Sequence, residues 1–216
     1  MTLNPHLTIA VAKGRTLEEA LPVLARSGIE PQEEPSTTRK LVLDTSEPGV
    51  KMVVVRAADV PTYVQLGAAD LGIVGKDVLM EHGGQELYEL LDLGIARCRM
   101  VVAEPRALAE GDDPSRWTRL RIATKYPGTT RRHFAKKGVQ TEVITLYGSM
   151  ELAPLSGLAD RIVDLVSSGN TLRANDLVEV EHIENISARL VANIAAMRMK
   201  QDRMKALIAR IGDTVR

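Results

Sequence analysis

Cysteine is almost absent from the 216-residue sequence, which contains only Cys98. A single cysteine excludes an internal disulfide and a zinc site built from cysteines. The histidines are scattered along the chain without metal-ligand spacing, at His6, His82, His133 and His182. The sequence therefore predicts no structural metal site.

Aromatic residues are also scarce, and the formal net charge is zero. Phe, Trp and Tyr make up 3% of the residues, and 28 Lys and Arg residues balance 28 Asp and Glu residues. A general nucleic-acid binder is usually basic, and single-strand binders stack bases on aromatic side chains. We therefore expect no nucleic-acid partner, and any phosphate site must be built from a local cluster of residues.

Long hydrophobic runs are missing as well. No segment approaches the ~20 apolar residues needed to cross a membrane. The first residues, MTLNPHLTIAVAKG, lack the basic start and the apolar core of a signal peptide. We therefore expect a soluble, cytoplasmic protein with no membrane partner, long enough for one large domain or two small ones.

The most informative stretch runs from Gly157 to Asn175 and reads GLADRIVDLVSSGNTLRAN. Residues 161–166 form a short, mostly apolar run with β-branched residues, as in a buried strand, and residues 172–175 can begin a helix. Between them lies a small polar loop. A strand, such a loop and a helix start form an arrangement that binds phosphate through backbone N–H groups and hydroxyls. The candidate loop residues are Ser167, Ser168, Gly169, Asn170 and Thr171.

Two carboxylates, Asp160 and Asp164, come just before this loop. At that position they would accept hydrogen bonds from sugar hydroxyls or hold a metal bound to a phosphorylated ligand. The alternative is an ordinary corner between a strand and a helix, with Ser168 or Asn170 as the N-cap. The stretch contains neither a Walker motif nor a G-x-G-x-x-G motif.

Strand and helix patterns alternate along the rest of the chain, which predicts an α/β fold with a partly parallel sheet. Two such series are separated near residues 94–104, and no flexible linker joins them. Ligands bind such sheets at the strand ends. Lys13 and Arg15 follow the first predicted strand and Lys125 follows a later one, so these three residues are ligand candidates. Solvated charges at a turn are the alternative for Lys13 and Arg15.

Hydrophobic residues recur with heptad spacing near the C-terminus, at Leu190, Ile194, Met197, Met204, Ile208 and Ile211. This spacing predicts a long helical region. We expect this region to face the core, and a helix packed on another subunit is the alternative.

Several stretches together resemble one enzyme family. In chain order they are Lys13-Gly14-Arg15, Arg39-Lys40-Leu41, residues 56–75 (RAADVPTYVQLGAADLGIVG), residues 123–127 (ATKYP), residues 147–154 (YGSMELAP) and the phosphate-loop stretch. They resemble ATP phosphoribosyltransferase, the first enzyme of histidine biosynthesis, and the resemblance spans nearly the whole chain.

The resemblance implies two α/β domains similar to type II periplasmic binding proteins, with the active site in the interdomain cleft. The first domain is expected to be discontinuous, at residues 1–94 and 179–216. The second is expected at residues 95–178 and carries the phosphoribosyl pyrophosphate loop.

The implied reaction transfers the phosphoribosyl group of phosphoribosyl pyrophosphate to N1 of ATP, giving phosphoribosyl-ATP and pyrophosphate by direct displacement. The resemblance implies that the loop at 167–171 binds the 5-phosphate. Asp164, with Glu151 or Asp160, is expected to accept from the ribose hydroxyls.

Neutralising the departing pyrophosphate would require Mg²⁺ and arginines. Arg15 and Arg39 are the expected catalytic residues. The expected ATP contacts are Lys13, Gly14, Arg56, Asp70 and Lys125. For Arg56, a structural ion pair with Asp70 is the alternative.

Mg²⁺ is the implied cofactor, with no direct protein ligand assigned and Asp164 as a candidate. The chain ends soon after the last helix and so resembles the short form of the family. That form implies a separate regulatory subunit similar to histidyl-tRNA synthetase, a homodimer within a hetero-oligomer, and feedback inhibition by histidine through the partner.

Two alternative interpretations of the chain, a ligand-binding module and a degenerate structural subunit, would imply no turnover with these substrates. A ligand-binding module also has two α/β lobes, but a missing signal peptide and a missing helix-turn-helix disfavour a solute receptor and a regulator. A degenerate structural subunit is disfavoured because the phosphate loop and its flanking acids are intact.

Overall fold

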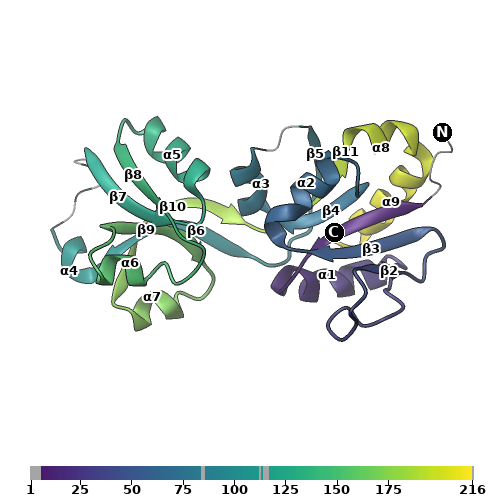
Figure 1. Ribbon diagram of the computed structural model, residues 1–216, viewed down its shortest axis with the longest axis horizontal. Coiled ribbons are helices and arrows are strands. Elements are labelled where there is room, and N and C mark those ends of the chain that lie inside the picture. The colour runs from purple at the N-terminus through teal and green to yellow at the C-terminus, as the bar shows by residue number, and fades with distance from the viewer. Residues whose placement is uncertain (1–5, 84–85, 112, 114–116, 216) are drawn as a thin grey trace. The chain divides into compact units, whose positions relative to one another are not determined.

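The computed structural model describes residues 6–83, 86–111, 113 and 117–215. The chain folds into two compact units. The first consists of two segments, one that ends at Ala96 and one that begins at Ser187, and the second runs from Arg97 to Ile186. The predicted mixed α/β architecture is confirmed, with one sheet in each unit (Figure 1). The return to the first unit comes at Ser187 rather than at 179, because the strand at Leu177–Ile186 pairs within the second unit along its whole length.

The first unit contains a six-stranded sheet in the order β2-β3-β1-β4-β11-β5. Its strands are β1 (Leu7–Ala12), β2 (Val42–Asp44), β3 (Val50–Val55), β4 (Leu71–Gly75), β5 (Leu87–Asp92) and β11 (Ala188–Asn193). β1 runs parallel to β3 and β4, whereas β2 and β11 are antiparallel to their neighbours. The carboxyl ends of β1, β3 and β4 therefore share one edge of the sheet.

Helices cover both faces of this sheet. The helices of the unit are α1 (Arg15–Arg26), η1 (Ala57–Asp59), α2 (Val60–Gln65), α3 (Lys76–His82), α8 (Ile194–Met199) and α9 (Gln201–Thr214). α1, α8 and α9 share a core cluster with Leu7, Ile9 and Val11 of β1. α2 and α3 share another cluster with Ala10 and Ala12. Because both faces of β1 are buried, this strand is continuously apolar rather than alternating.

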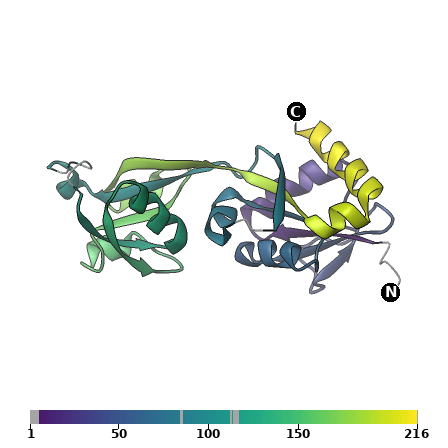
Figure 2. The same cartoon turned by 90° about the horizontal axis from the view of Figure 1, so that it is seen from above.

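The C-terminal region differs from its prediction. Leu190 lies in β11, and the chain turns at Lys200 between α8 and α9, which are yellow in Figure 2. The expectation of one helical region from Leu190 onward is therefore wrong, because pairing of β11 between β4 and β5 overrides the heptad spacing. Met204 and Ile211 of α9 are fully buried against the core, as expected for a core-facing helix.

The second unit contains a five-stranded sheet in the order β10-β6-β9-β7-β8. Its strands are β6 (Cys98–Pro105), β7 (Arg119–Thr124), β8 (Gln140–Thr145), β9 (Arg161–Val166) and β10 (Leu177–Ile186), and its helices are α4 (Arg106–Ala109), α5 (Pro127–Lys136), α6 (Leu152–Leu155) and α7 (Asn170–Ala174). β7, β8 and β9 are parallel, so the segments that follow them lie at one edge of the sheet. No helix in the described part of the chain is long and apolar enough to span a membrane.

Candidate active site

A cavity of about 210 Å³ lies where β9 ends and the chain passes into α7. The residues that line it are Glu151, Asp164, Leu165, Val166, Ser167, Ser168, Gly169, Asn170, Thr171 and Leu172. All the loop residues that the sequence predicts for phosphate binding therefore lie on one cavity, together with the predicted carboxylates Asp164 and Glu151. The apolar lining residues, Leu165, Val166 and Leu172, were not predicted as part of a site.

The shape of the loop follows from its sequence. β9 is buried between two neighbouring strands and holds the start of the loop, and the buried Leu172 anchors α7 at its other end. Between them, Gly169 adopts a left-handed conformation with φ of 75°. A Cβ atom at this position would lie 3.2 Å from Nη1 of Arg173, and Nη2 of the same guanidinium donates to the side-chain oxygen of Asn170. Glycine is therefore needed for the turn and for the space beside it.

The two carboxylates of the cavity come from different segments. Asp164 is half-buried on β9 and accepts a hydrogen bond from the Leu165 amide at 2.8 Å. Glu151 is also half-buried and precedes α6, in the segment that follows β8. Backbone amides and hydroxyls suit a phosphate group, and carboxylates suit sugar hydroxyls. The cavity therefore fits a phosphorylated sugar better than a bare anion.

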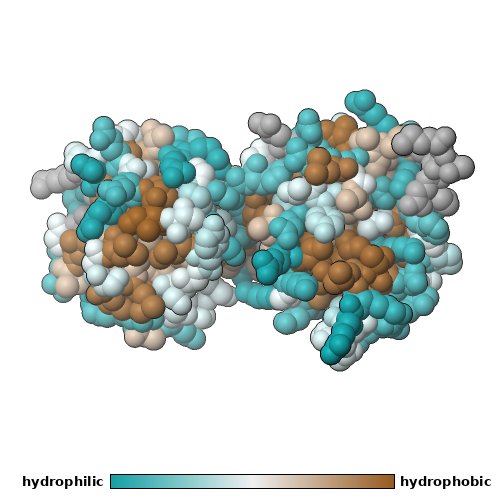
Figure 3. Space-filling model, in the orientation of Figure 1, coloured by the Kyte–Doolittle hydropathy of each residue, from teal (hydrophilic) through white to brown (hydrophobic). Residues whose placement is uncertain are grey.

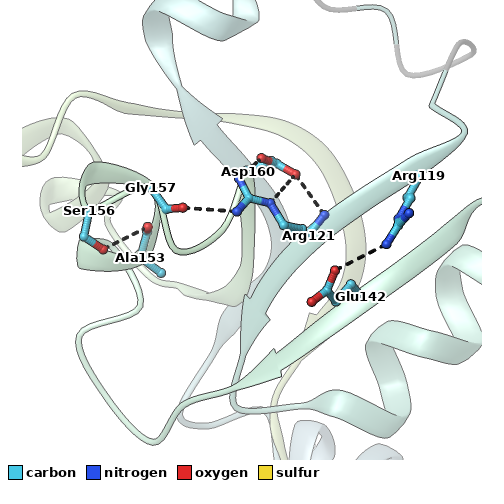
Figure 4. A network of polar contacts seen from close by, with 7 residues as sticks. All are labelled: Arg119, Arg121, Glu142, Ala153, Ser156, Gly157 and Asp160. Carbon is cyan, nitrogen blue, oxygen red and sulfur yellow. Dashed lines mark hydrogen bonds and ion pairs between the residues drawn. The ribbon is translucent and has the colours of Figure 1, made fainter.

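The third predicted carboxylate, Asp160, lies elsewhere. Its oxygens accept from the Arg121 backbone amide at 2.9 Å and from the Arg121 guanidinium at 2.7 Å (Figure 4). The hydrogen bond from the Arg121 side chain is the main reason that the pKa of Asp160 lies below its ordinary value. Asp160 precedes β9, whereas the loop follows it, and six strand residues span about 20 Å. Its predicted contact with the sugar is therefore not supported, and its role is to join β9 to β7.

The predicted residues of the first unit gather mainly at one sheet edge. Lys13, Gly14 and Arg15 follow β1, and Arg56 follows β3, whose last residue pairs with the last residue of β1. The Lys13 amide donates to the Val55 carbonyl at 2.9 Å, which ties these two strand ends together. Lys13, Arg15 and Arg56 are exposed there. The edge therefore presents cations, as a site for polyphosphate requires.

Arg39 and Lys125 are also exposed, but on other segments. Arg39 lies in the loop between α1 and β2. Lys125 follows β7 in the second unit, at the same sheet edge as the phosphate loop. Lys125 is therefore a candidate for binding anions beside that loop.

Asp70 does not join the residues at the first unit's carboxyl edge. It precedes β4 and lies beside Thr8, at the opposite edge of the sheet from Arg56. Its carboxylate accepts from the Thr8 amide and forms an ion pair with Lys200, each at 2.8 Å. The partner of Asp70 is thus Lys200 rather than Arg56, and its position supports a structural role over contact with ATP.

Three polar contacts of or beside the predicted site residues were missed by sequence reasoning. Glu19 accepts from Nε of Arg15 at 2.6 Å and from the Ala96 amide at 2.7 Å. The Ala96 hydrogen bond first, and then the one from Arg15, hold the pKa of Glu19 below its ordinary value. In the second unit, Arg99 donates to the Ser167 carbonyl at 3.2 Å. No sequence motif signals the Ala96–Glu19 or the Arg99–Ser167 contact, because each joins residues far apart in the chain, whereas Arg15 and Glu19 lie four residues apart within α1.

The donor set of the cavity limits how a metal ion can be held. Among the described residues, no group of three or more His, Cys, Asp or Glu side chains is placed to hold a metal. The cavity offers the Asp164 and Glu151 carboxylates. Such a site fits a Mg²⁺ ion that is held mostly by water and substrate oxygens.

Comparison with solved structures first defines the fold class. The periplasmic VFT2 domain of Bordetella pertussis BvgS aligns over 98% of this chain and 92% of its own with a TM-score of 0.57 and 13% identity. A substrate-binding protein of an amino acid ABC transporter aligns over 97% of this chain and 91% of its own, with a TM-score of 0.55 and 14% identity. These similarities show the fold alone. The chain has the two-unit α/β architecture of periplasmic binding proteins, with a small polar loop and two carboxylates on one cavity.

The family follows from closer relatives. The family model HisG, ATP phosphoribosyltransferase, matches residues 56–213. ATP phosphoribosyltransferases of Acidithiobacillus ferrooxidans and Chromobacterium violaceum are each 59% identical, the first over 97% of both chains and the second over 94% of this chain and 95% of its own. The ATP phosphoribosyl transferase (HisG:HisZ) complex from Thermotoga maritima contains a chain with a TM-score of 0.82 and 32% identity, over 97% and 98% of the two chains. The chain belongs to the ATP phosphoribosyltransferase family and is a transferase.

Proposed function

We propose that this chain catalyses the first step of histidine biosynthesis, the transfer of the phosphoribosyl group of phosphoribosyl pyrophosphate to N1 of ATP. The observation that carries the proposal is the cavity at the end of β9, where the loop 167–171 lies beside Asp164 and Glu151. The amides and hydroxyls of the loop bind the 5-phosphate. The two carboxylates accept from the ribose hydroxyls and so fix the sugar for displacement at its anomeric carbon.

The proposed reaction is a direct displacement. N1 of adenine forms a bond to the anomeric carbon as the bond from that carbon to the pyrophosphate oxygen breaks, and pyrophosphate leaves with the electron pair. No covalent intermediate with the protein is required. The demand on the protein is to stabilise negative charge on the leaving group, and Arg15 and Arg39 are proposed to do so.

Mg²⁺ is proposed as a companion of phosphoribosyl pyrophosphate rather than as a resident metal. Asp164 and Glu151 are the residues that would hold it, with the remaining positions filled by water and substrate oxygens. When bound, the ion would supply further neutralisation of the leaving pyrophosphate.

ATP is proposed to contact the exposed cations at the strand ends. Lys13, Gly14 and Arg56 are the proposed contacts in the first unit and Lys125 in the second. The support is the clustering of Lys13, Gly14 and Arg56 beside the paired ends of β1 and β3.

A protein partner is also proposed. The similar Thermotoga maritima chain was solved in a HisG:HisZ complex, and this supports a regulatory subunit for the present chain. Both units show hydrophobic surface (Figure 3), and large exposed side chains near α6 include Tyr147, Leu152, Leu155 and Leu158. Such surface is typical of chains that associate. We propose a homodimer that joins a histidyl-tRNA synthetase-like subunit in the cytoplasm, with feedback inhibition by histidine through that subunit.

The test is an absorbance assay with ATP, phosphoribosyl pyrophosphate and Mg²⁺, with pyrophosphatase to pull the equilibrium. It is run with and without the partner subunit and with and without histidine. Turnover that requires both substrates supports the proposal, and inhibition by histidine only with the partner supports the regulatory assignment. Absence of turnover in the presence of the partner contradicts the proposal and favours a ligand-binding module.

A further inference from the structure

The side chain of Arg99 connects the phosphate loop to strand β10. Nε and Nη2 of Arg99 lie 2.8 Å from one carboxylate oxygen of Glu179. Nη1 donates to the carbonyl oxygen of Ser167, the first residue of the loop, at 3.2 Å. The guanidinium group of Arg99 therefore binds the loop backbone through Nη1, while its Nε and Nη2 are bound by Glu179.

The contact with Ser167 fixes more than one carbonyl group. The peptide bond between Ser167 and Ser168 is trans and planar, so its C=O and N–H groups point in opposite directions. While the carbonyl oxygen points at Arg99, the Ser168 amide must point away from Arg99. Both serines line the cavity, whereas Arg99 is absent from the described residues that line it.

The orientation of this peptide bond matters for an anion. A carbonyl oxygen carries partial negative charge and repels a phosphate, whereas an amide N–H attracts it. If the Ser167–Ser168 peptide turned over, the loop would lose a donor and place an acceptor at the cavity. Arg99 holds the carbonyl oxygen and thereby opposes this rotation.

We propose that Arg99 is a positioning residue for the phosphate-binding loop and that Glu179 anchors it. The proposal deepens the proposed function, since it rests on binding of the 5-phosphate by residues 167–171. Arg99 acts here through geometry rather than through charge, because Glu179 neutralises it. The hydrogen bond with Glu179 also raises the pKa of the Arg99 guanidinium above its ordinary value.

Because the side chains of Arg99 and Glu179 are partly exposed, substitutions at these two positions can test the proposal without unfolding the protein. The side chains of Arg99 and Glu179 are 37% and 29% exposed. Ion pairs of this kind contribute little to global stability. A matched control is available in Arg106, which pairs with Asp176 at 3.0 Å in the same unit but does not contact the loop.

The first experiment compares Arg99→Ala, Arg99→Lys, Glu179→Gln and Arg106→Ala by steady-state kinetics of the complex with its partner. Arg99→Ala should raise KM for phosphoribosyl pyrophosphate about tenfold, the cost of one charged hydrogen bond. KM for ATP should change less than about twofold. Arg99→Lys should recover part of the loss, since one ammonium group cannot reproduce the fork of a guanidinium. Glu179→Gln should show a smaller increase, and Arg106→Ala none.

Equal increases of both KM values in Arg99→Ala, or an effect no larger than that of Arg106→Ala, would overturn the proposal. A second measurement does not depend on turnover. Amide hydrogen exchange should become faster in a peptide covering residues 167–171 in Arg99→Ala but not in Arg106→Ala, with equal melting temperatures. Unchanged exchange in this peptide also overturns the proposal. Failure of the proposed function is distinguished by the wild-type complex, which would then show no turnover.

Discussion

The ammonium group of Lys200 lies 2.8 Å and 3.0 Å from the two carboxylate oxygens of Asp70 and 2.7 Å from the carbonyl oxygen of His6. Asp70 in turn accepts the Thr8 amide at 2.8 Å. The two side chains are only 17% and 10% exposed. This pair therefore fastens the junction of α8 and α9 to the amino ends of β1 and β4.

Asp70→Asn should therefore lower the free energy of unfolding of the protein without changing KM for ATP. Loss of one partner of a largely buried ion pair costs about 3 kcal/mol in the free energy of unfolding. Denaturant unfolding and KM for ATP would be measured together. Asp44→Asn is the control, because its ion pair with Lys51 is long, at 3.6 Å, and exposed. A raised KM for ATP at unchanged stability would restore Asp70 to the ATP site.

Gly169→Ala should weaken binding of phosphoribosyl pyrophosphate. Alanine would be strained at φ of 75°, and its Cβ would meet Arg173. We expect KM for phosphoribosyl pyrophosphate to rise much more than KM for ATP. Gly138→Ala is the matched control, since it has φ of 74° in the same unit and no atom close to a new Cβ. Both substitutions should cost about 1 kcal/mol of stability, and equal kinetic effects would contradict the role of the loop.

Arg39→Ala should slow the chemical step. Loss of one electrostatic contact to a leaving group typically reduces the rate by about 10²–10³. The measurement is the single-turnover rate at saturating substrates. Lys40→Ala is the control, since Lys40 adjoins Arg39 and is paired with Glu33. A rate for Arg39→Ala equal to that of the wild type would remove Arg39 from the catalytic residues.

Glu19→Gln should impair the reaction through Arg15. The neutral amide would weaken the hydrogen bonds to Arg15 and to the Ala96 amide, and we expect about a fivefold lower single-turnover rate, equivalent to ~1 kcal/mol. Glu18→Gln changes the same charge at an exposed neighbouring position of α1. Equal rates in both variants would show that Glu19 does not orient Arg15.

Asp160 should contribute stability that depends on pH. Its pKa is lowered in the folded state, so its contribution is present above the unfolded pKa of about 3.9 and disappears as the pH falls through the folded value. At neutral pH, Asp160→Asn should cost about 1 kcal/mol or less, because the side chains of Asp160 and Arg121 are 35% and 44% exposed. The difference from the wild type should vanish in acid. Asp176→Asn is the exposed control, and an increased KM for phosphoribosyl pyrophosphate in Asp160→Asn would contradict a purely structural role.

The local hydrophobic and polar pattern of the sequence was sufficient to predict elements that depend only on neighbouring residues. The apolar run at residues 7–12 predicts β1, and the small polar residues after 161–166 predict the loop. Asp164 could be placed with that loop because it lies at the same end of β9. The fold class could be predicted because strands and helices alternate with distinct periods.

Pairing between distant segments could not be predicted in the same way. Asp160 is close to the loop in sequence, but the length of β9 separates them, and Asp70 faces Lys200 from far along the chain. Leu190 fits a helical pattern, but sheet pairing places it in β11. The contact of Arg99 with Ser167 depends on side-chain reach after the sheet has formed.

The position of β11 has a consequence for synthesis on the ribosome. β11 lies between β4 and β5, and it is the only link between these two strands in the described sheet. Residues 97–186, the whole second unit, are translated before it. During that interval β4 has an unpaired edge and its hydrophobic neighbours lack part of their cover. The second unit can therefore reach its native state on a nascent chain, whereas the first is completed only after β11 and the helices α8 and α9 have left the exit tunnel.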